Sequence, residues 1–198
     1  MQSKVVEEEY EWKKRCIENG SQIRYSSLCR PPSLPHLLHH PRAFIKVGDK
    51  IPNLDTLVEN SPANKVNLSE LTTGKALIIG VPAAFSPSCS NSHIPGYINH
   101  PKLKEAGNVF VVAVNDPFVT KAWGSTLDPT GESGIRFLGD PTASFTSALD
   151  LTFDGTAIFG GPRSKRYALE IEDGKVKALH VEPDNTGLDV SAASKVLG

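Results

Sequence analysis

Apolar residues occur in short runs along most of the chain, and turn or capping residues separate the runs. Continuous apolar runs are typical of strands buried on both faces of a sheet, whereas alternating runs indicate strands with one exposed face. Continuous runs predict strands at residues 76–81 and 108–114, and a third strand is expected at residues 135–140. An alternating run predicts a further strand at residues 45–52 that ends at Pro52.

The clearest local pattern lies at residues 167–181, where two alternating runs flank Asp173-Gly174. Asp-Gly between such runs is typical of a β-hairpin with a type I′ turn. Helices are expected where a capping residue opens a segment with helical spacing. The expected helix starts are Asn67 or Ser69, Ser86 or Ser88, Asp116, Thr142 and Ser191.

This order of elements predicts an α/β fold with a mixed central sheet and helices on both faces. Right-handed crossovers bring the ends of parallel strands to one edge of the sheet, where open α/β sheets bind ligands. Cys89 follows the strand at 76–81 and is expected at that edge. Residues 45–198 are expected to form this domain, and residues 1–44 an N-terminal extension.

The extension has no acidic residue between positions 21 and 43, where arginines lie among serines and prolines. This composition is typical of an organellar presequence, although the acidic start of the chain argues against a standard one. A targeting segment and a disordered extension both stay open, so the expected compartment is cytoplasmic or mitochondrial. His36, His39 and His40 lie near Cys29, but a solvated tail is favoured over a metal site because no second ligand cluster follows.

A net charge of −1 gives no basic surface for nucleic acid or an anionic membrane, so neither partner is expected. The sequence also lacks an apolar run near the roughly 18–20 residues that a transmembrane helix needs. Three cysteines, an odd number, do not suggest a secreted disulfide framework. A reducing compartment is favoured, in which an isolated cysteine is more often reactive than structural.

Cys89 is the candidate reactive residue. With Ser86 or Ser88 as cap and Pro87 in the first turn, Cys89 lies at the start of a helix, where free backbone N–H groups favour the thiolate. The alternative is a buried cysteine that acts as a small hydrophobe. The neighbouring Pro82, Ser86 and His93 make this alternative much less favourable.

The spacing of Pro82, Ser86 and Cys89 resembles the active-site signature of peroxiredoxins, and the longer string from Gly80 to Gly96 resembles the type 5 (type II) subfamily. The resemblance continues to the end of the chain. It includes Val114-Asn-Asp-Pro-Phe-Val with Trp123, Asp140-Pro-Thr, Lys165-Arg-Tyr and Val181-Glu-Pro-Asp-Asn-Thr-Gly. One departure is Ser86, where most members carry threonine. The resemblance implies a thioredoxin-like fold and a cofactor-free, thiol-dependent peroxidase that reduces hydrogen peroxide and alkyl hydroperoxides through a cysteine sulfenic acid.

The family pattern also implies roles for individual residues. Cys89 is the expected nucleophile, and Ser86 is expected to donate to the thiolate or to accept from the peroxide. Pro82 is expected to shield the sulfur from water, and Arg166 to hold the sulfur and a peroxide oxygen. His93 either tunes the site or bonds to backbone. Arg163 is interpreted as a solvated residue of an edge strand.

The expected partners are the peroxide and an external thiol reductant, which is thioredoxin, glutaredoxin or glutathione. Animal members of the subfamily carry a resolving cysteine shortly after the Thr-Gly-Leu segment, where this chain has Val190, and plant members carry theirs where this chain has Val111. The domain is therefore expected to work with one cysteine. The family often dimerises near the active site, and an apolar patch of Phe85, Phe118 and Trp123 is the candidate interface.

Three alternatives remain in view. A dithiol oxidoreductase would need Cys-x-x-Cys, and Ser86 occupies the first position of that spacing. A Cys–His hydrolase would need a distant histidine within a motif, and His180 lies in none. A redox-sensing binding protein would use Cys89 oxidation as a signal, and it would stop after about one equivalent of peroxide.

Overall fold

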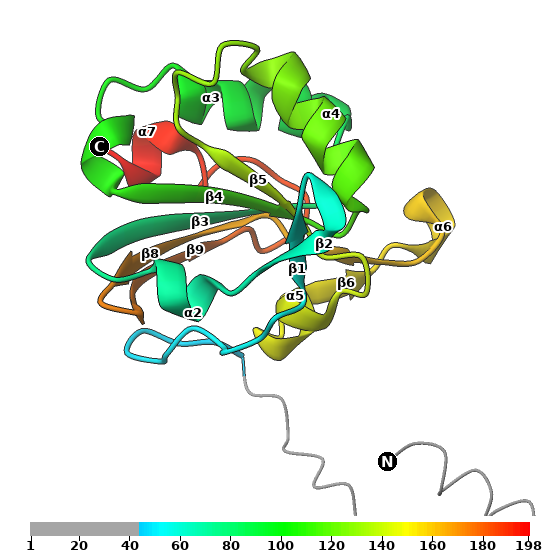
Figure 1. Cartoon of the computed structure of the whole chain (residues 1–198), viewed down its shortest axis with the longest axis horizontal. Helices are drawn as coiled ribbons and strands as arrows, with labels where there is room; N and C mark the ends of the chain where they lie inside the picture. The colour runs from blue at the N-terminus through cyan, green and yellow to red at the C-terminus, as the bar shows by residue number, and fades with distance from the viewer. Residues whose placement is uncertain (1–43) are drawn as a thin grey trace, which may run out of the picture. The chain divides into compact units, whose positions relative to one another are not determined.

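The computed structural model describes residues 44–198, which form a seven-stranded mixed sheet with helices on both faces (Figure 1). The strands are β1 (Leu57–Glu59), β2 (Ser61–Val66), β3 (Lys75–Val81), β4 (Asn108–Ala113), β5 (Arg136–Gly139), β8 (Tyr167–Glu172) and β9 (Lys175–Val181). Two further strands, β6 (Thr152–Asp154) and β7 (Pro162–Ser164), pair separately. The helical segments are α2 (Leu68–Leu71), η1 (Cys89–His93), α3 (Ile94–Ile98), η2 (Leu103–Ala106), α4 (Pro117–Leu127), α5 (Ser144–Ala148), α6 (Thr156–Phe159) and α7 (Ala193–Val196). The expectations for the N-terminal extension and its histidines lie outside the described residues.

The sheet has the order β2-β1-β5-β4-β3-β8-β9. Strands β3, β4 and β5 run parallel, whereas β8 lies antiparallel to β3. The mixed α/β fold predicted from the order of elements is confirmed. Gly80 pairs with Tyr167 in the β3–β8 register, so the end of β3 lies beside the start of β8. This pairing brings together the segments that carry Cys89 and Arg166.

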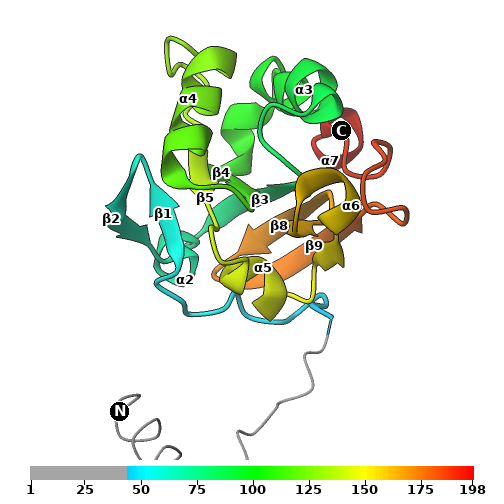
Figure 2. The ribbon, with the colours of Figure 1, turned by 90° about the vertical axis from the view of Figure 1, so that its right-hand side faces the viewer.

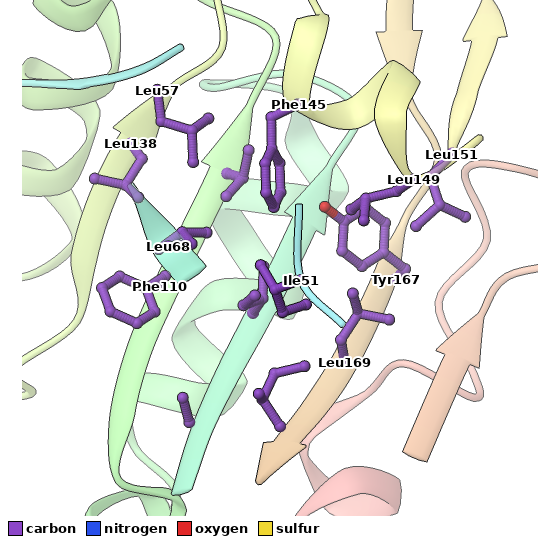
Figure 3. Close-up of a cluster of buried hydrophobic side chains, with 14 of the residues drawn as sticks. Ile51, Leu57, Leu68, Phe110, Leu138, Phe145, Leu149, Leu151, Tyr167 and Leu169 are labelled. Carbon is purple, nitrogen blue, oxygen red and sulfur yellow. The ribbon is translucent and has the colours of Figure 1, made fainter. Parts of the chain in front are cut away.

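Each face of the sheet has its own apolar cluster. On one face, α2 and α5 contribute Leu68 and Phe145 to a cluster that includes Tyr167 (Figure 3). On the other face, α3, α4 and α7 cover the sheet (Figures 1 and 2), and Ile94, Tyr97 and Trp123 are part of the cluster beneath them. No helix among residues 44–198 is long and apolar enough to cross a membrane.

The predicted strand at residues 45–52 is wrong. The segment turns at Gly48, whose φ is 93°, and its only pairing is an isolated bridge between Lys50 and Lys175. Ile45 and Ile51 are nevertheless buried. The alternating pattern therefore reflects burial of these two side chains. The backbone of the segment does hydrogen-bond to the edge of the sheet, through Gly48 N to the Val176 carbonyl and Ile51 N to the Gly174 carbonyl, but it does not form a strand.

Two predicted helix starts are confirmed and two are wrong. Asn67 caps α2 and Asp116 caps α4, each through side-chain bonds to backbone N–H groups. Helix α5 is capped by the Asp140 carboxylate rather than by Thr142. Ser191 does not cap α7, because its hydroxyl donates to Glu182 instead. The type I′ turn is confirmed by the positive φ angles of both Asp173 and Gly174.

Gly80 is a test of the β3–β8 contact. A Cβ at this position would lie 2.0 Å from Cε1 of Tyr167, so we expect Gly80→Ala to lower the free energy of unfolding by about 1–3 kcal/mol. The control is Gly96→Ala in α3, where the new Cβ meets only Ala193 Cβ at 3.8 Å and the helix gains about 0.5–1 kcal/mol. Urea unfolding measures both. Equal stability of the two variants would contradict this close approach.

Candidate active site

Cys89 lies just beyond the carboxyl end of a buried parallel strand. Pro82 follows β3 directly and is buried, and Phe85 then turns the chain with a φ of 60°. The helix begins at Pro87, and Cys89 occupies its first turn, where η1 is π-helical. The Cys89 side chain is completely buried. The predicted helix-start position of this thiol is confirmed.

Arg166 is the cation closest to the thiol, and it is itself only 1% exposed. Its Nη1 donates to Cys89 Sγ over 3.3 Å. Its Nε donates to the Gly187 carbonyl at 2.8 Å, and Nη2 donates to the Thr186 carbonyl at 3.1 Å. Because several donors of the guanidinium are engaged, the group is fixed in the orientation that faces the sulfur.

The charge of Arg166 has no carboxylate partner within ion-pair distance among residues 44–198. A buried cation without a counter-ion is costly, and carbonyl dipoles compensate it only in part. Among the described residues, the side-chain groups in hydrogen-bond contact with the guanidinium are His93 Nδ1 and the sulfur of Cys89. The guanidinium therefore places both its positive charge and an N–H donor directly against the sulfur of Cys89.

His93 connects the guanidinium to the C-terminal segment. Arg166 Nη1 lies 3.0 Å from His93 Nδ1, and His93 Nε2 lies 3.1 Å from the Ser191 carbonyl oxygen. Since arginine only donates and a carbonyl only accepts, Nδ1 must be the bare nitrogen and Nε2 must carry the proton. Burial first, and then the charge of Arg166, lowers the pKa of His93 to about 3. His93 is therefore a neutral imidazole with a defined tautomer, and it both contacts the site and bonds to backbone.

Ser86 lies one turn before the nucleophile, and its hydroxyl donates to the Ala83 carbonyl at 3.0 Å. Its proton is thus engaged, and its lone pairs remain for an incoming donor. Of the two expected roles, this geometry favours acceptance from the peroxide over donation to the sulfur.

Two sequence-based interpretations need correction. Arg163 lies on the edge strand β7 as expected but is half-buried rather than solvated, because its guanidinium donates to the carbonyls of Val114 and Phe159 and lies over the Phe159 ring. Trp123 cannot belong to a surface patch, because its side chain is completely buried and Nε1 donates to Ser90 Oγ. Both side chains hold segments that adjoin the site.

Sequence reasoning missed the acceptors that hold Arg166 and His93. Thr186, Gly187 and Ser191 act through backbone carbonyls, which every residue type carries, so no residue pattern identifies them. Tyr97 was missed as well, although its hydroxyl donates to the same Ser191 carbonyl at 2.6 Å. Its spacing of four residues after His93 is the one available signal.

A buried thiol in contact with a buried guanidinium, at the end of a parallel strand, defines a thiol-based oxidoreductase of the thioredoxin-like class. The Redoxin family model matches residues 46–197. Peroxisomal membrane associated protein 20 of Schizosaccharomyces pombe is 44% identical over 157 residues, which cover 78% of this chain and 98% of that protein. Peroxiredoxin-2C of Oryza sativa is 35% identical over 161 residues, with coverage of 78% and 98%.

Among solved structures, peroxiredoxin 5 of Alvinella pompejana is 40% identical with a TM-score of 0.64, and the match covers 72% of this chain and 92% of that one. The chain belongs to the Redoxin family, and within it to the type 5 peroxiredoxins. It is a thiol-dependent peroxidase, and a redox-sensing protein without turnover is not favoured.

The neutral state of His93 predicts a pH dependence of stability. Below pH 6.5 the unfolded chain protonates this histidine, whereas the folded protein does so only near pH 3. The unfolded state then binds more protons, so the free energy of unfolding falls as the pH falls, by at most about 1.4 kcal/mol per pH unit from this group. Urea unfolding between pH 6.5 and about pH 4.5 measures this, and His93→Gln should have a shallower slope. Protonation of the His93 ring near pH 6.5 in nitrogen NMR spectra of the folded protein would contradict it.

Proposed function

We propose that Cys89 reduces peroxides directly and that Arg166 is the catalytic cation. The thiolate attacks the terminal oxygen of the peroxide, an S–O bond forms, and the O–O bond breaks. Cys89 is oxidised to a sulfenic acid, and the leaving oxygen is reduced and takes a proton to become water or an alcohol. The observation that supports these roles is the 3.3 Å contact from Arg166 Nη1 to Cys89 Sγ.

Arg166 serves this reaction because negative charge moves from the sulfur to the departing oxygen. A preorganised donor near both atoms stabilises that distribution more than it stabilises the ground state. Ser86 orients the peroxide by accepting a hydrogen bond from its O–H group, since the Ser86 hydroxyl itself donates to the Ala83 carbonyl. Pro82, which lacks an N–H and is buried, keeps water from the sulfur. His93 holds the guanidinium through its bare Nδ1.

The oxidised enzyme is recycled by an external thiol, which is thioredoxin, glutaredoxin or glutathione. Cys89 is the sole cysteine among residues 44–198, and Val111 and Val190 occupy the positions of the resolving cysteines described above. Val111 is buried in β4, and a valine at either position forms no disulfide. The sulfenic acid therefore persists until an external thiol condenses with it.

A homodimer through the face beside the active site stays a prediction. Phe85 and Phe118 are 52% and 64% exposed. A hydrogen bond from Ala84 N to Asn115 Oδ1 links the loop of Phe85 to the residues just before α4, whose first turn contains Phe118. These two side chains, without Trp123, form the candidate interface. A cytoplasmic or mitochondrial compartment likewise stays a prediction, and the Schizosaccharomyces pombe relative is described as peroxisomal membrane associated.

The two arginines of the Arg163–Arg166 segment separate the catalytic role from a structural one. Arg166→Ala should slow oxidation of Cys89 by roughly two to three orders of magnitude, the usual cost of one preorganised donor. Arg163→Ala should lower the unfolding midpoint but leave the oxidation rate of the folded protein near that of the wild type, because its donors go to Val114 and Phe159. Stopped-flow oxidation measures both, with Cys89→Ser as the inactive reference. The reverse ranking would mean that the wrong arginine is assigned.

Mass spectrometry tests recycling with one cysteine. After one equivalent of peroxide, the full chain should gain one oxygen atom, and glutathione should then convert this species to a mixed disulfide. The Cys16→Ser/Cys29→Ser double variant should behave in the same way. It should also sustain turnover with whichever of thioredoxin, glutaredoxin or glutathione supports turnover of the wild type. A disulfide between Cys89 and either N-terminal cysteine, formed in high yield, would overturn the one-cysteine mechanism.

A further inference from the structure

We propose that Glu182 is a positioning residue for the reaction, because its carboxylate closes the segment 182–191 around the Arg166 side chain. The proposal deepens the function proposed above and rests on its assignment of Cys89 and Arg166. Glu182 lies directly after β9 and touches neither the thiol nor the guanidinium head group through a bond of its side chain. Its effect must therefore pass through the segment that it closes.

The Glu182 carboxylate joins the two ends of the segment 182–191 by hydrogen bonds, and this set of bonds is called the clasp. Oε1 accepts hydrogen bonds from Asp189 N at 2.8 Å, Ser191 N at 2.9 Å and Ser191 Oγ at 2.7 Å. The residue is only 3% exposed, and no cation among residues 44–198 lies within ion-pair distance of its carboxylate. Burial by itself would raise the pKa of Glu182, but the donors of Ser191 and Asp189 outweigh burial and hold that pKa below its usual value. The clasp is therefore an ionised carboxylate held by fixed donors.

Arg166 is hydrogen-bonded to the closed segment through its backbone and its side chain. Its backbone N–H donates to the Asn185 carbonyl at 2.7 Å, and its own carbonyl accepts from Glu182 N at 3.0 Å. The side chain then donates to the carbonyls of Thr186 and Gly187. The carbonyls that aim the guanidinium thus belong to the segment whose two ends the Glu182 carboxylate joins.

The far end of the clasp reaches the active site by a second route. Ser191, held by Glu182 through both its N–H and its hydroxyl, presents its carbonyl to His93 Nε2 and to the Tyr97 hydroxyl. His93 in turn accepts from Arg166 Nη1, the nitrogen that also contacts Cys89 Sγ. A displacement of Ser191 would therefore move His93 and, through it, Arg166 Nη1, which faces the sulfur. Both routes end at the orientation of Arg166, and misplacement of about 1 Å can reduce a rate by about a hundredfold.

A set of variants at position 182 tests the proposal. Glu182→Ala should slow oxidation of Cys89 by about 10- to 100-fold in stopped-flow measurements on the folded full chain. Glu182→Gln keeps an oxygen acceptor at the same reach and should recover most of the rate. Glu182→Asp keeps the charge but is one methylene too short, so it should be slow as well, and it serves as the second variant if Glu182→Ala fails to fold.

Asp128→Ala is the matched control. The Asp128 carboxylate also accepts from the N–H and hydroxyl of one serine, Ser133, but it lies after α4 and makes no contact with the site residues. Its loss should lower the unfolding midpoint and leave the oxidation rate unchanged. A general effect of losing such a clasp would slow both variants equally, and that result would overturn the proposal.

A double-mutant cycle separates positioning from other effects of Glu182. In an Arg166→Ala background, Glu182→Ala should cause no further slowing, because both changes remove the same interaction. Additive losses would mean that Glu182 acts by another route and would overturn the proposal. If Arg166→Ala is slow while Glu182→Ala and Glu182→Asp react at the wild-type rate, the inference fails and the proposed function stands. If Arg166→Ala itself reacts at the wild-type rate, the proposed function fails first.

Discussion

A buried guanidinium is the constraint on which the rest of the site depends. Transfer of such a cation out of water costs several kcal/mol, and that cost must be offset by groups fixed around it. For Arg166 these groups are two backbone carbonyls, a neutral imidazole and the sulfur of Cys89. Because the carbonyls and the imidazole are neutral, the positive charge of the guanidinium faces the sulfur without compensation by a carboxylate among residues 44–198. In the proposed function, the reactivity of Cys89 thus depends on the burial of Arg166.

The polar network around this cation has a defined direction. Arg166 only donates, so His93 must accept at Nδ1 and donate from Nε2 to Ser191. Burial raises the pKa of Tyr97, so its hydroxyl stays protonated and also donates to Ser191. Each hydrogen bond between Arg166, His93, Tyr97 and Ser191 has a single possible donor. The network therefore resists rearrangement. Such rigidity suits a donor that must be in place before charge moves.

The sequence predicted the strands whose buried residues are apolar. The predictions failed for strands with exposed polar residues and for side chains whose hydrogen-bond partners are distant in the sequence. The apolar runs at β3 and β4 and the Asp173-Gly174 turn were correctly predicted, because apolar continuity and turn chemistry are local properties. The strand β5 was predicted as well. The hairpin of β1 and β2 was missed, since Pro62 and exposed polar residues hide the strand pattern of β2. Cys89, Arg166 and His93 were brought together as expected, but Ser191 was expected as a helix cap. A serine hydroxyl can cap a helix or donate to a distant carboxylate. Which of the two Ser191 does depends on the position of Glu182 in the fold.

The contact between Cys89 and Arg166 joins residues 77 positions apart in the sequence, and it forms only when β8 pairs with β3. During synthesis at roughly 5–20 residues per second, the nucleophile leaves the ribosome several seconds before its cation. In a nascent or truncated chain, Cys89 therefore lacks both the guanidinium and the C-terminal segment that surround it in the folded protein. The reactive form of the cysteine appears only once the last strands are in place. Completion of folding thus decides when the assisted reaction with peroxide becomes available, and an incomplete chain has only the slow reaction of an unassisted thiol.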